Sequence, residues 1–213
     1  MSAETTFTLP RLSIGPVQIG FPAVQAALSG YSDLAMRVIA RRLGASYAVN
    51  EVVLDQFVLT KSRKEKHQLA VADEEHPVGG QLMGANPDEF GPAAQVLAQA
   101  GYDVIDINFG CPVKKVLGRC RGGFLLSQPR TALEIVSRVR DHVPPHIPVT
   151  VKMRRGLDDT EASRDKFFEI FDGAFARGVA AVTVHGRTVE QRYVGPSRWS
   201  FLRDLKQQYP HRT

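Results

Sequence analysis

Cysteine is scarce in this 213-residue chain, and no long apolar run interrupts it. Only Cys111 and Cys120 are present, and their spacing fits neither a disulfide framework nor a Cys-x-x-Cys metal or redox motif. No run approaches the roughly 18 apolar residues of a membrane span, and the N-terminus lacks the basic-then-apolar pattern of a secretory signal. We therefore expect a cytoplasmic protein with no metal and no membrane contact, whose cysteines act as single thiols.

The composition is that of an ordinary globular protein. Hydrophobic residues make up 43% of the chain and charged residues 23%, which excludes disorder, collagen-like repeats and coiled coil for the chain as a whole. The 27 Lys and Arg residues exceed the 22 Asp and Glu residues, giving a formal charge of +5. This excess suits a polyanionic partner such as nucleic acid, but many ordinary enzymes carry as much.

Short apolar runs alternate with helical patterns along the chain. The runs predict a hairpin over 12–20 and strands over 22–28, 46–52, 78–82, 103–108, 147–152 and 180–185. Helices are expected over 33–43, 87–100, 129–142, 160–177 and 197–208, and a helix with a solvated connection over 53–76. Ser32 and Asn86 are the expected N-caps of the first two helices. The alternation is typical of parallel β/α units.

Two observations favour a barrel over an open, doubly wound sheet. No G-x-G-x-x-G follows the first strand, as a dinucleotide-binding fold would require. Polar residues also fall at the C-terminal ends of successive strands, which in a barrel converge on one mouth where active sites are built. These residues are Ser29, Glu51, Gln81, Asn108, Lys152 and His185. The predicted fold is an α/β barrel of the (β/α)8 TIM type, truncated after about six β/α units.

The segment DINFGCP at 106–112 places a thiol at the predicted barrel mouth. A strand ending at Asn108 is followed by Gly110, Cys111 and Pro112, which together form a constrained turn. A lone cysteine is most often a small buried hydrophobe. The polar turn favours a reactive thiol over that alternative here.

The loop after this turn is basic. It carries four cations in eight residues, Lys114, Lys115, Arg119 and Arg121. Such a run is often only a solvated surface. Beside a reactive thiol at a barrel mouth, the run favours a clamp for a phosphate backbone.

Two further segments place charged groups at strand ends. In TVKMRRG at 150–156, Lys152 and Arg154 alternate with apolar residues and so share one face. An inward lysine is costly unless it meets an anion or an electron-rich acceptor. In TVHGRT at 183–188, His185 ends the next strand and Arg187 begins its loop. A solitary histidine is usually a structural hydrogen bonder, but a lysine and a histidine at neighbouring strand ends favour a shared ligand such as a carbonyl-rich ring.

Taken in order, these segments resemble the bacterial tRNA-dihydrouridine synthases, FMN-dependent (β/α)8 barrels that reduce uridine in tRNA. The resemblance runs almost end to end. Each piece alone is weak, whereas the combination at barrel-compatible spacing is specific. The matching segments are LSGYSD (28–33), NEVV (50–53), VGGQLMG (78–84), DINFGCPVKKV (106–116), VKMRRG (151–156) and VHGRTVEQRY (184–193).

The resemblance implies roles for individual residues. Cys111 would be the general acid that protonates carbon 5 of uracil after a hydride from the flavin reaches carbon 6, with NADPH or NADH as electron donor. A thiol close to its protonated state suits that role, so we expect Lys114 and Lys115 to point outward to tRNA phosphates, because close cations would lower the thiol pKa. The implied flavin contacts are Ala27, Leu28, Gln81, Lys152 and His185. The implied substrate contacts are Asn108, Lys114, Lys115, Arg119, Arg154 and Arg187.

The sequence departs from the family pattern in three places. AAL at 26–28 stands where the family usually has Ala-Pro-Met, and Cys120, Arg121 and Phe124 replace small residues. The sequence ends at HRT, whereas the family continues with two more strands that bind the FMN phosphate and a helical tRNA-binding domain. We therefore expect residues 1–213 to form an incomplete FMN-dependent barrel domain. Two alternatives stay open: another FMN barrel of the dihydroorotate dehydrogenase type, and an inactive or merely RNA-binding fragment.

Overall fold

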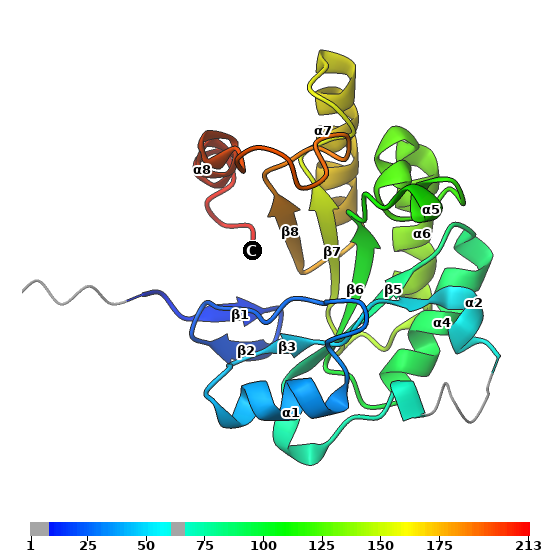
Figure 1. Cartoon of the computed structure of the whole chain (residues 1–213), viewed down its shortest axis with the longest axis vertical. Coiled ribbons are helices and arrows are strands. Elements are labelled where there is room, and N and C mark those ends of the chain that lie inside the picture. The colour runs from blue at the N-terminus through cyan, green and yellow to red at the C-terminus, as the bar shows by residue number, and fades with distance from the viewer. Residues whose placement is uncertain (1–8, 61–66) are drawn as a thin grey trace, which may run out of the picture.

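The computed structural model describes residues 9–60 and 67–213. Its centre is a curled six-stranded sheet in which all paired strands run parallel, in the order β3-β5-β6-β7-β8, with β4 also paired to β5. Helices α4, α6 and α7 cover one side of the sheet, and a small β1–β2 hairpin lies at the other (Figure 1). The predicted α/β barrel-type fold is confirmed, as a half-barrel.

The strands are short at the start of the sheet and longer from β5 onward. The hairpin and the last four predicted strands are confirmed to within two residues at each end, and the runs that form β5, β6 and β7 are almost wholly buried. The bounds are β1 (Leu12–Ile14), β2 (Val17–Gly20), β3 (Ala48–Val49), β4 (Val53–Leu54), β5 (Val78–Met83), β6 (Val104–Phe109), β7 (Val149–Arg154) and β8 (Ala181–His185).

The strand predicted over 22–28 is wrong. Only Gln25 pairs there, in an isolated parallel bridge with Ala48. The residues that follow belong to a loop closed by Ser32, whose hydroxyl accepts from the Leu28 backbone N–H at 2.8 Å and donates to the Ala26 carbonyl at 3.2 Å. A hydroxyl that binds nearby backbone in this way competes with the strand ladder.

The strand predicted over 46–52 divides into β3 and β4. Asn50 stands between them, and its side-chain oxygen accepts from the Gln81 backbone N–H at 2.7 Å. A side chain therefore takes a backbone donor of β5 that a strand carbonyl would otherwise bind. The ladder with β5 resumes at Val53.

The helices follow the sequence prediction closely. Asn86 caps α4 as predicted, whereas α1 is capped by Asp33 rather than Ser32, because the Ser32 hydroxyl is committed to the Leu28 loop. In the segment 53–76, residues 61–66 lie outside the described part. The helices are α1 (Leu34–Arg42), α2 (Asp55–Val58), α4 (Pro87–Gln99), α5 (Lys114–Leu117), α6 (Pro129–His142), α7 (Glu161–Ala176) and α8 (Trp199–Gln208), with 3-10 turns η1 (Asp73–Glu75) and η2 (Gly122–Ser127).

Strand β6 shows how the sheet separates core from site. Ile105, Ile107 and Phe109 are fully buried in the main hydrophobic cluster, which includes residues of α4, α6 and α7. Asp106 and Asn108 alternate with them and so face the opposite, concave side. The helix-covered face is the apolar core, and the concave face is left for polar chemistry. Within residues 9–60 and 67–213, no helix has the length and apolar character to cross a membrane.

A buried ion pair fastens α1 to the 3-10 turn η1. The Arg37 guanidinium donates to both Glu75 carboxylate oxygens, at 2.8 and 3.1 Å, and to the backbone carbonyls of Ser32 and Ala70. Both side chains are shielded from water, with 1% or less of their surface exposed. Such a pair is strongly destabilising to break because it would leave a buried charge without its partner.

Candidate functional site

Polar side chains occupy the concave face in layers set by strand register. Because alternate residues of a strand share a face, residues two apart on β6 and β7 stack toward the C-terminal ends of the strands. The register defines three layers from the bottom to the mouth: Gln81–Asp106–Thr150, Asn108–Lys152, and Arg154–His185. The structure thus brings five of the predicted site residues, Gln81, Asn108, Lys152, Arg154 and His185, onto one face.

A cavity of about 280 Å³ opens on this face. Ala27, Gln81 and Lys152 line it together, as a shared flavin site requires. Leu28 and His185 lie outside the lining. Leu28 is 48% exposed and does not line this cavity, so its contact with a flavin stays a prediction.

The backbone of the Cys111 turn is held from three sides. The Asn108 side-chain oxygen accepts from the backbone N–H groups of Gly110 at 2.9 Å and Cys111 at 3.1 Å. The Cys111 carbonyl accepts from Gly123 N–H at 3.0 Å. Arg154 Nε donates to the Gly110 carbonyl at 2.9 Å. The half-buried thiol therefore sits on a fixed backbone at the strand ends.

Arg154 connects this turn to the loop after β8. The residue is 3% exposed, and its Nη1 donates to the carbonyls of Thr188 at 2.8 Å and Arg192 at 2.7 Å. Its guanidinium lies 5.7 Å from the Tyr193 ring centre. Arg187 donates to the Gly195 carbonyl in the same loop. Both arginines hold backbone at the mouth, and their contacts with substrate stay a prediction.

Burial, and for His185 the neighbouring positive charges, disfavour protonation of the side chains at the mouth. Burial lowers the pKa of Lys152, and the Asp106 carboxylate works against this shift. Burial, together with the positive charges of Arg154, Lys152 and Arg187, lowers the pKa of His185 to about 4. His185 is therefore neutral at pH 7, where its ring can both donate and accept a hydrogen bond.

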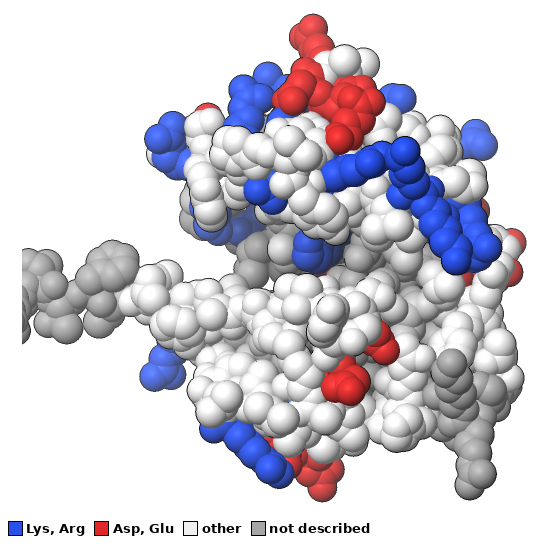
Figure 2. All heavy atoms as spheres, viewed as in Figure 1, with Lys and Arg blue, Asp and Glu red and all other residues white. Residues whose placement is uncertain are grey.

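The basic loop divides between surface and interior. Lys114 and Lys115 on α5, and Arg119 after it, are exposed, and Figure 2 shows blue side chains over the α5 region. Arg121 is buried instead, and its Nη2 donates to the Gln56 side-chain oxygen at 2.8 Å. The interpretation of this run as a four-cation clamp is therefore corrected to three surface cations.

Two residues of the lowest layer, Asp106 and Thr150, were not predicted from the sequence. Asp106 is buried and accepts from Gln81 Nε2 at 2.6 Å and from the Thr150 hydroxyl at 2.5 Å. The alternation of Asp106, Ile107 and Asn108 within one strand was the available signal, because it places the carboxylate and the amide on the same face.

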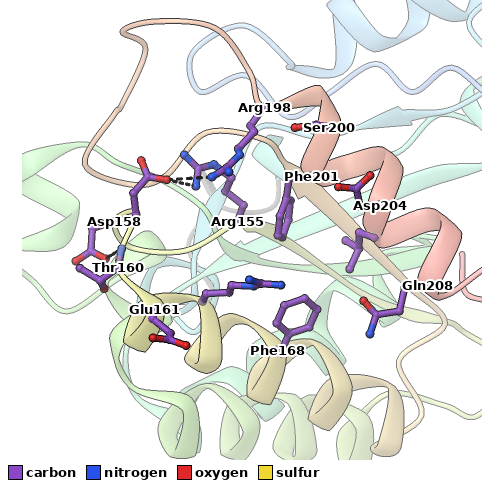
Figure 3. Close-up of a pocket in the computed structure, with 13 residues that line it drawn as sticks. Arg155, Asp158, Thr160, Glu161, Phe168, Arg198, Ser200, Phe201, Asp204 and Gln208 are labelled. Carbon is purple, nitrogen blue, oxygen red and sulfur yellow. Dashed lines mark hydrogen bonds and ion pairs between the residues drawn. The ribbon is translucent and has the colours of Figure 1, made fainter.

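A second hollow, of about 430 Å³, lies between α7 and α8, away from these layers (Figure 3). Three of its charged side chains pair with one another: Asp159 accepts from Arg155 and lies 3.5 Å from Arg198. None of the predicted site residues lines it. Among the residues that the structure describes, no group of three or more His, Cys, Asp and Glu side chains could hold a metal ion.

A curled parallel sheet with its polar layers and a thiol-bearing turn at the C-terminal strand ends defines a protein of the α/β barrel class. Comparison with known families identifies it further. Residues 24–212 match the sequence model of the dihydrouridine synthase (Dus) family, so the chain belongs to this family.

Curated relatives carry the same family description. A probable tRNA-dihydrouridine synthase of Rickettsia typhi is 36% identical over 92% of this chain and 59% of its own length. The tRNA-dihydrouridine synthase B of Xanthomonas axonopodis pv. citri is 32% identical over 92% of this chain and 57% of its own. A probable tRNA-dihydrouridine synthase of Mycobacterium tuberculosis is 36% identical over 93% and 52%. The chain thus spans between half and three fifths of these relatives.

Solved structures confirm the fold alone. Morphinone reductase superposes with a TM-score of 0.65 over 93% of this chain and 76% of its own, at 13% identity. A structure of morphinone reductase in complex with tetrahydroNAD gives a TM-score of 0.66 at 12% identity.

Proposed function

We propose that this protein is a tRNA-dihydrouridine synthase, which reduces the carbon 5–carbon 6 double bond of uridine in tRNA. Membership of the Dus family supports this class of reaction. The observation that carries the proposal is the Cys111 turn, fixed by Asn108 at the mouth above a cavity that Lys152 lines. A proton donor at the mouth and a cation in the wall of the cavity are what reduction of a uracil ring requires.

The residues present fit the ring of a flavin. Gln81 and Lys152 offer an amide and an ammonium group to the polar edge of a ring, and Ala27 offers a small apolar wall. The lysine charge suits a ring that becomes anionic on reduction. When bound, FMN would supply the hydride for carbon 6, after accepting it from NADPH or NADH.

Cys111 holds the proton for the other ring carbon. Its thiol would donate that proton to carbon 5, forming a carbon–hydrogen bond and leaving a thiolate, which regains a proton from water. The fixed turn keeps the sulfur at one position, since a small displacement of a proton donor is costly in rate. Neutral His185 adds a hydrogen-bonding ring at the mouth without adding charge.

The three surface cations provide the proposed contact with tRNA. Lys114, Lys115 and Arg119 lie on or just after α5, directly after the Cys111 turn. Phosphate groups flanking a uridine at the mouth would be within reach of such side chains, and phosphate contacts position a nucleic acid without reading its sequence. The cytoplasmic location expected from the sequence stays a prediction.

The test is the dihydrouridine content of tRNA. We expect a strain of the source organism deleted for this gene to lose dihydrouridine at one or more positions, measured by nucleoside mass spectrometry. The intact gene should restore it, and the gene carrying Cys111→Ala should not. Unchanged dihydrouridine in the deletion strain would reject the proposal. Flavin in the purified protein would then favour another FMN barrel, and its absence the non-catalytic alternative.

A further inference from the structure

We propose that Asp106 is a positioning residue for the site. It sets the direction of two side-chain amides, those of Gln81 and Asn108. Through them it holds the Cys111 turn and makes Asn108 a hydrogen-bond donor toward a pyrimidine carbonyl. The part concerning the pyrimidine rests on the proposed function, whereas the part concerning the turn does not.

Asp106 begins a chain of hydrogen bonds in the lowest layer. Its side chain is buried, with Gln81 on β5 and Thr150 on β7 donating to its two oxygens. Burial raises its pKa, while these two hydrogen bonds and the Lys152 ammonium favour the ionised form. A carboxylate in this form has no proton to donate and can only accept. Both hydrogen bonds run toward the carboxylate oxygens, so the Gln81 NH2 group faces Asp106.

The direction passes from one amide to the next. Because the Gln81 NH2 group faces Asp106, its oxygen faces Asn108 and accepts from Asn108 Nδ2 at 2.8 Å. The Asn108 oxygen must then point the other way. There it accepts from the backbone N–H groups of Gly110 and Cys111. One carboxylate at the bottom of the site thus fixes an acceptor for the turn two layers higher.

This direction has a consequence for what Asn108 can recognise. Its oxygen is occupied by two backbone donors, while an amide NH2 group has two protons and only one is used by Gln81. The group that Asn108 offers to a ligand is therefore a donor. A donor matches a ring carbonyl, as in uracil, and not a ring amino group, as in cytosine. If the Asn108 amide were reversed, it would offer an acceptor to the ligand, and the backbone N–H groups of Gly110 and Cys111 would have no acceptor.

The turn can be tested without flavin or tRNA. Residues 1–213 are alkylated with iodoacetamide under native conditions, and the rates at Cys111 and Cys120 are read from separate tryptic peptides, since Lys114, Lys115 and Arg119 lie between the two thiols. Exposed Cys120 serves as the internal reference. Asp106→Asn keeps the size of the side chain but permits either amide direction. We expect it to raise the Cys111-to-Cys120 rate ratio about fivefold, the scale of one lost hydrogen bond.

Two further variants separate amide direction from general structure. Asp106→Asn combined with Gln81→Glu moves the carboxylate from position 106 to position 81. A carboxylate at position 81 can again only accept a hydrogen bond from Asn108. This double variant should return the rate ratio to the wild-type value. Asp165→Asn, which removes an exposed carboxylate on α7, should leave the ratio unchanged. An unchanged ratio in Asp106→Asn, or no return in the double variant, would overturn the proposal. If Asp106→Asn does not fold, the double variant alone decides, by matching or failing to match wild type.

The pyrimidine part is tested in the longest natural form of the protein, by its reduction of uridine in tRNA. Asp106→Asn should lower kcat/KM for tRNA about tenfold, as expected when a donor to a substrate carbonyl is misdirected. Asp165→Asn should not. Normal kcat/KM together with a raised alkylation ratio would overturn the pyrimidine part. An inactive wild-type protein would instead contradict the proposed function, with the alkylation result still standing.

Discussion

The two cysteines differ in what holds their backbone. Cys111 follows a buried strand, and Asn108, Arg154 and Gly123 bind the backbone of its turn. Cys120 is exposed and has a left-handed backbone with φ of 56°. A proton donor must stay within reach of the atom it protonates, so the fixed thiol is the better general acid.

We predict that Cys111→Ala lowers uridine reduction in the longest natural protein about 100-fold or more, the usual scale for one general acid. Reduction of bound flavin by NADPH or NADH should persist, because the thiol is not needed for that step. The measurement is single-turnover reduction of tRNA, with Cys120→Ala as the matched control. A larger loss from Cys120→Ala would reverse the assignment.

We also predict that His185 makes stability depend on pH. Its pKa is lowered to about 4 in the folded protein, from 6.5 when unperturbed, so the unfolded chain binds its proton more readily. Stability from this residue is therefore full above pH 6.5 and falls as the pH drops from 6.5 to 4. Urea unfolding of wild type and His185→Gln at pH 7 and pH 5 measures it, and the variant should lose less stability between the two. Equal losses in both proteins would contradict the lowered pKa.

At the residue scale, motif reasoning found side chains that end strands but not those beneath them. Asn108 and Lys152 could be predicted because each follows a buried apolar run near the end of its strand. Gln81 was also predicted as a strand end, but it lies within β5, in the lowest layer. Asp106 was missed because a carboxylate inside an apolar run has no local sign of its partners. Its hydrogen bonds come from residues 25 and 44 positions away, Gln81 and Thr150, and only the register of three strands brings them together.

At the scale of elements, long apolar runs were predicted well and short ones poorly. Strands β5, β6 and β7 have six residues each and are largely buried, so burial alone fixes them, whereas β8 has five residues and is mostly half-buried. The run over 22–28 has a similar composition, yet Ser32 closes it into a loop. Asn50 likewise divides the next run with one side-chain hydrogen bond. In both places the hydrogen bonds of a single polar side chain interrupt a strand that the apolar run would otherwise form. The periodicity of apolar residues carries no information about such hydrogen bonds.

We predict that Glu75→Gln lowers the free energy of unfolding by about 3–5 kcal/mol, because it leaves the buried Arg37 charge without its carboxylate. Helix α1 would lose its main tie to η1. Urea unfolding provides the measurement. The neighbouring pair of Arg42 and Glu74 joins the same two elements at the surface, with 66% and 46% of the side chains exposed. Glu74→Gln is thus a matched control and should have no measurable effect. Equal effects from the two substitutions would contradict the role of burial.

Charge reversal on and beside α5 tests the surface that we propose for tRNA. Lys114→Glu, Lys115→Glu and Arg119→Glu should each weaken tRNA binding and reduce the slope of log K against log salt by about one unit per lost phosphate contact. Arg203→Glu on α8 changes the charge equally at an exposed position far along the chain. It should leave the slope unchanged. If the slopes of the three variants do not differ from wild type, these cations do not contact tRNA and form an ordinary solvated surface.

At the scale of the whole molecule, the sheet in the described part of the chain is open. Strand β8 has β7 as its neighbour in the sheet order. On its other side, Val182 N–H donates at 3.0 Å to the carbonyl of Thr213, where the chain comes back beside the strand (Figure 1). Thr213 also lines the cavity that Gln81 and Lys152 share. In the described part of the chain, the segment that ends at Thr213 therefore borders the proposed flavin site.

We predict that a polypeptide of residues 1–213 binds FMN weakly. In barrels of this type the ligand phosphate is commonly held by loops after the seventh and eighth strands and by a helix N-terminus. The described residues supply ring contacts through Gln81 and Lys152. Charge-assisted hydrogen bonds contribute about 1.5–3 kcal/mol each, so a ligand lacking two of them binds some hundredfold more weakly or worse.

The measurement is flavin absorbance of purified residues 1–213 titrated with FMN, together with a sizing profile. The control is the Rickettsia typhi relative at full length, compared with the portion of it that matches this chain. We expect the full-length relative to retain flavin and both shorter polypeptides to lose it on gel filtration, because ring contacts alone dissociate quickly. The edge of β8 that pairs with no other strand should also promote self-association in the shorter forms. A yellow, monodisperse monomer of residues 1–213 would show that the ring contacts suffice, and that the phosphate is held by residues already present in this half-barrel.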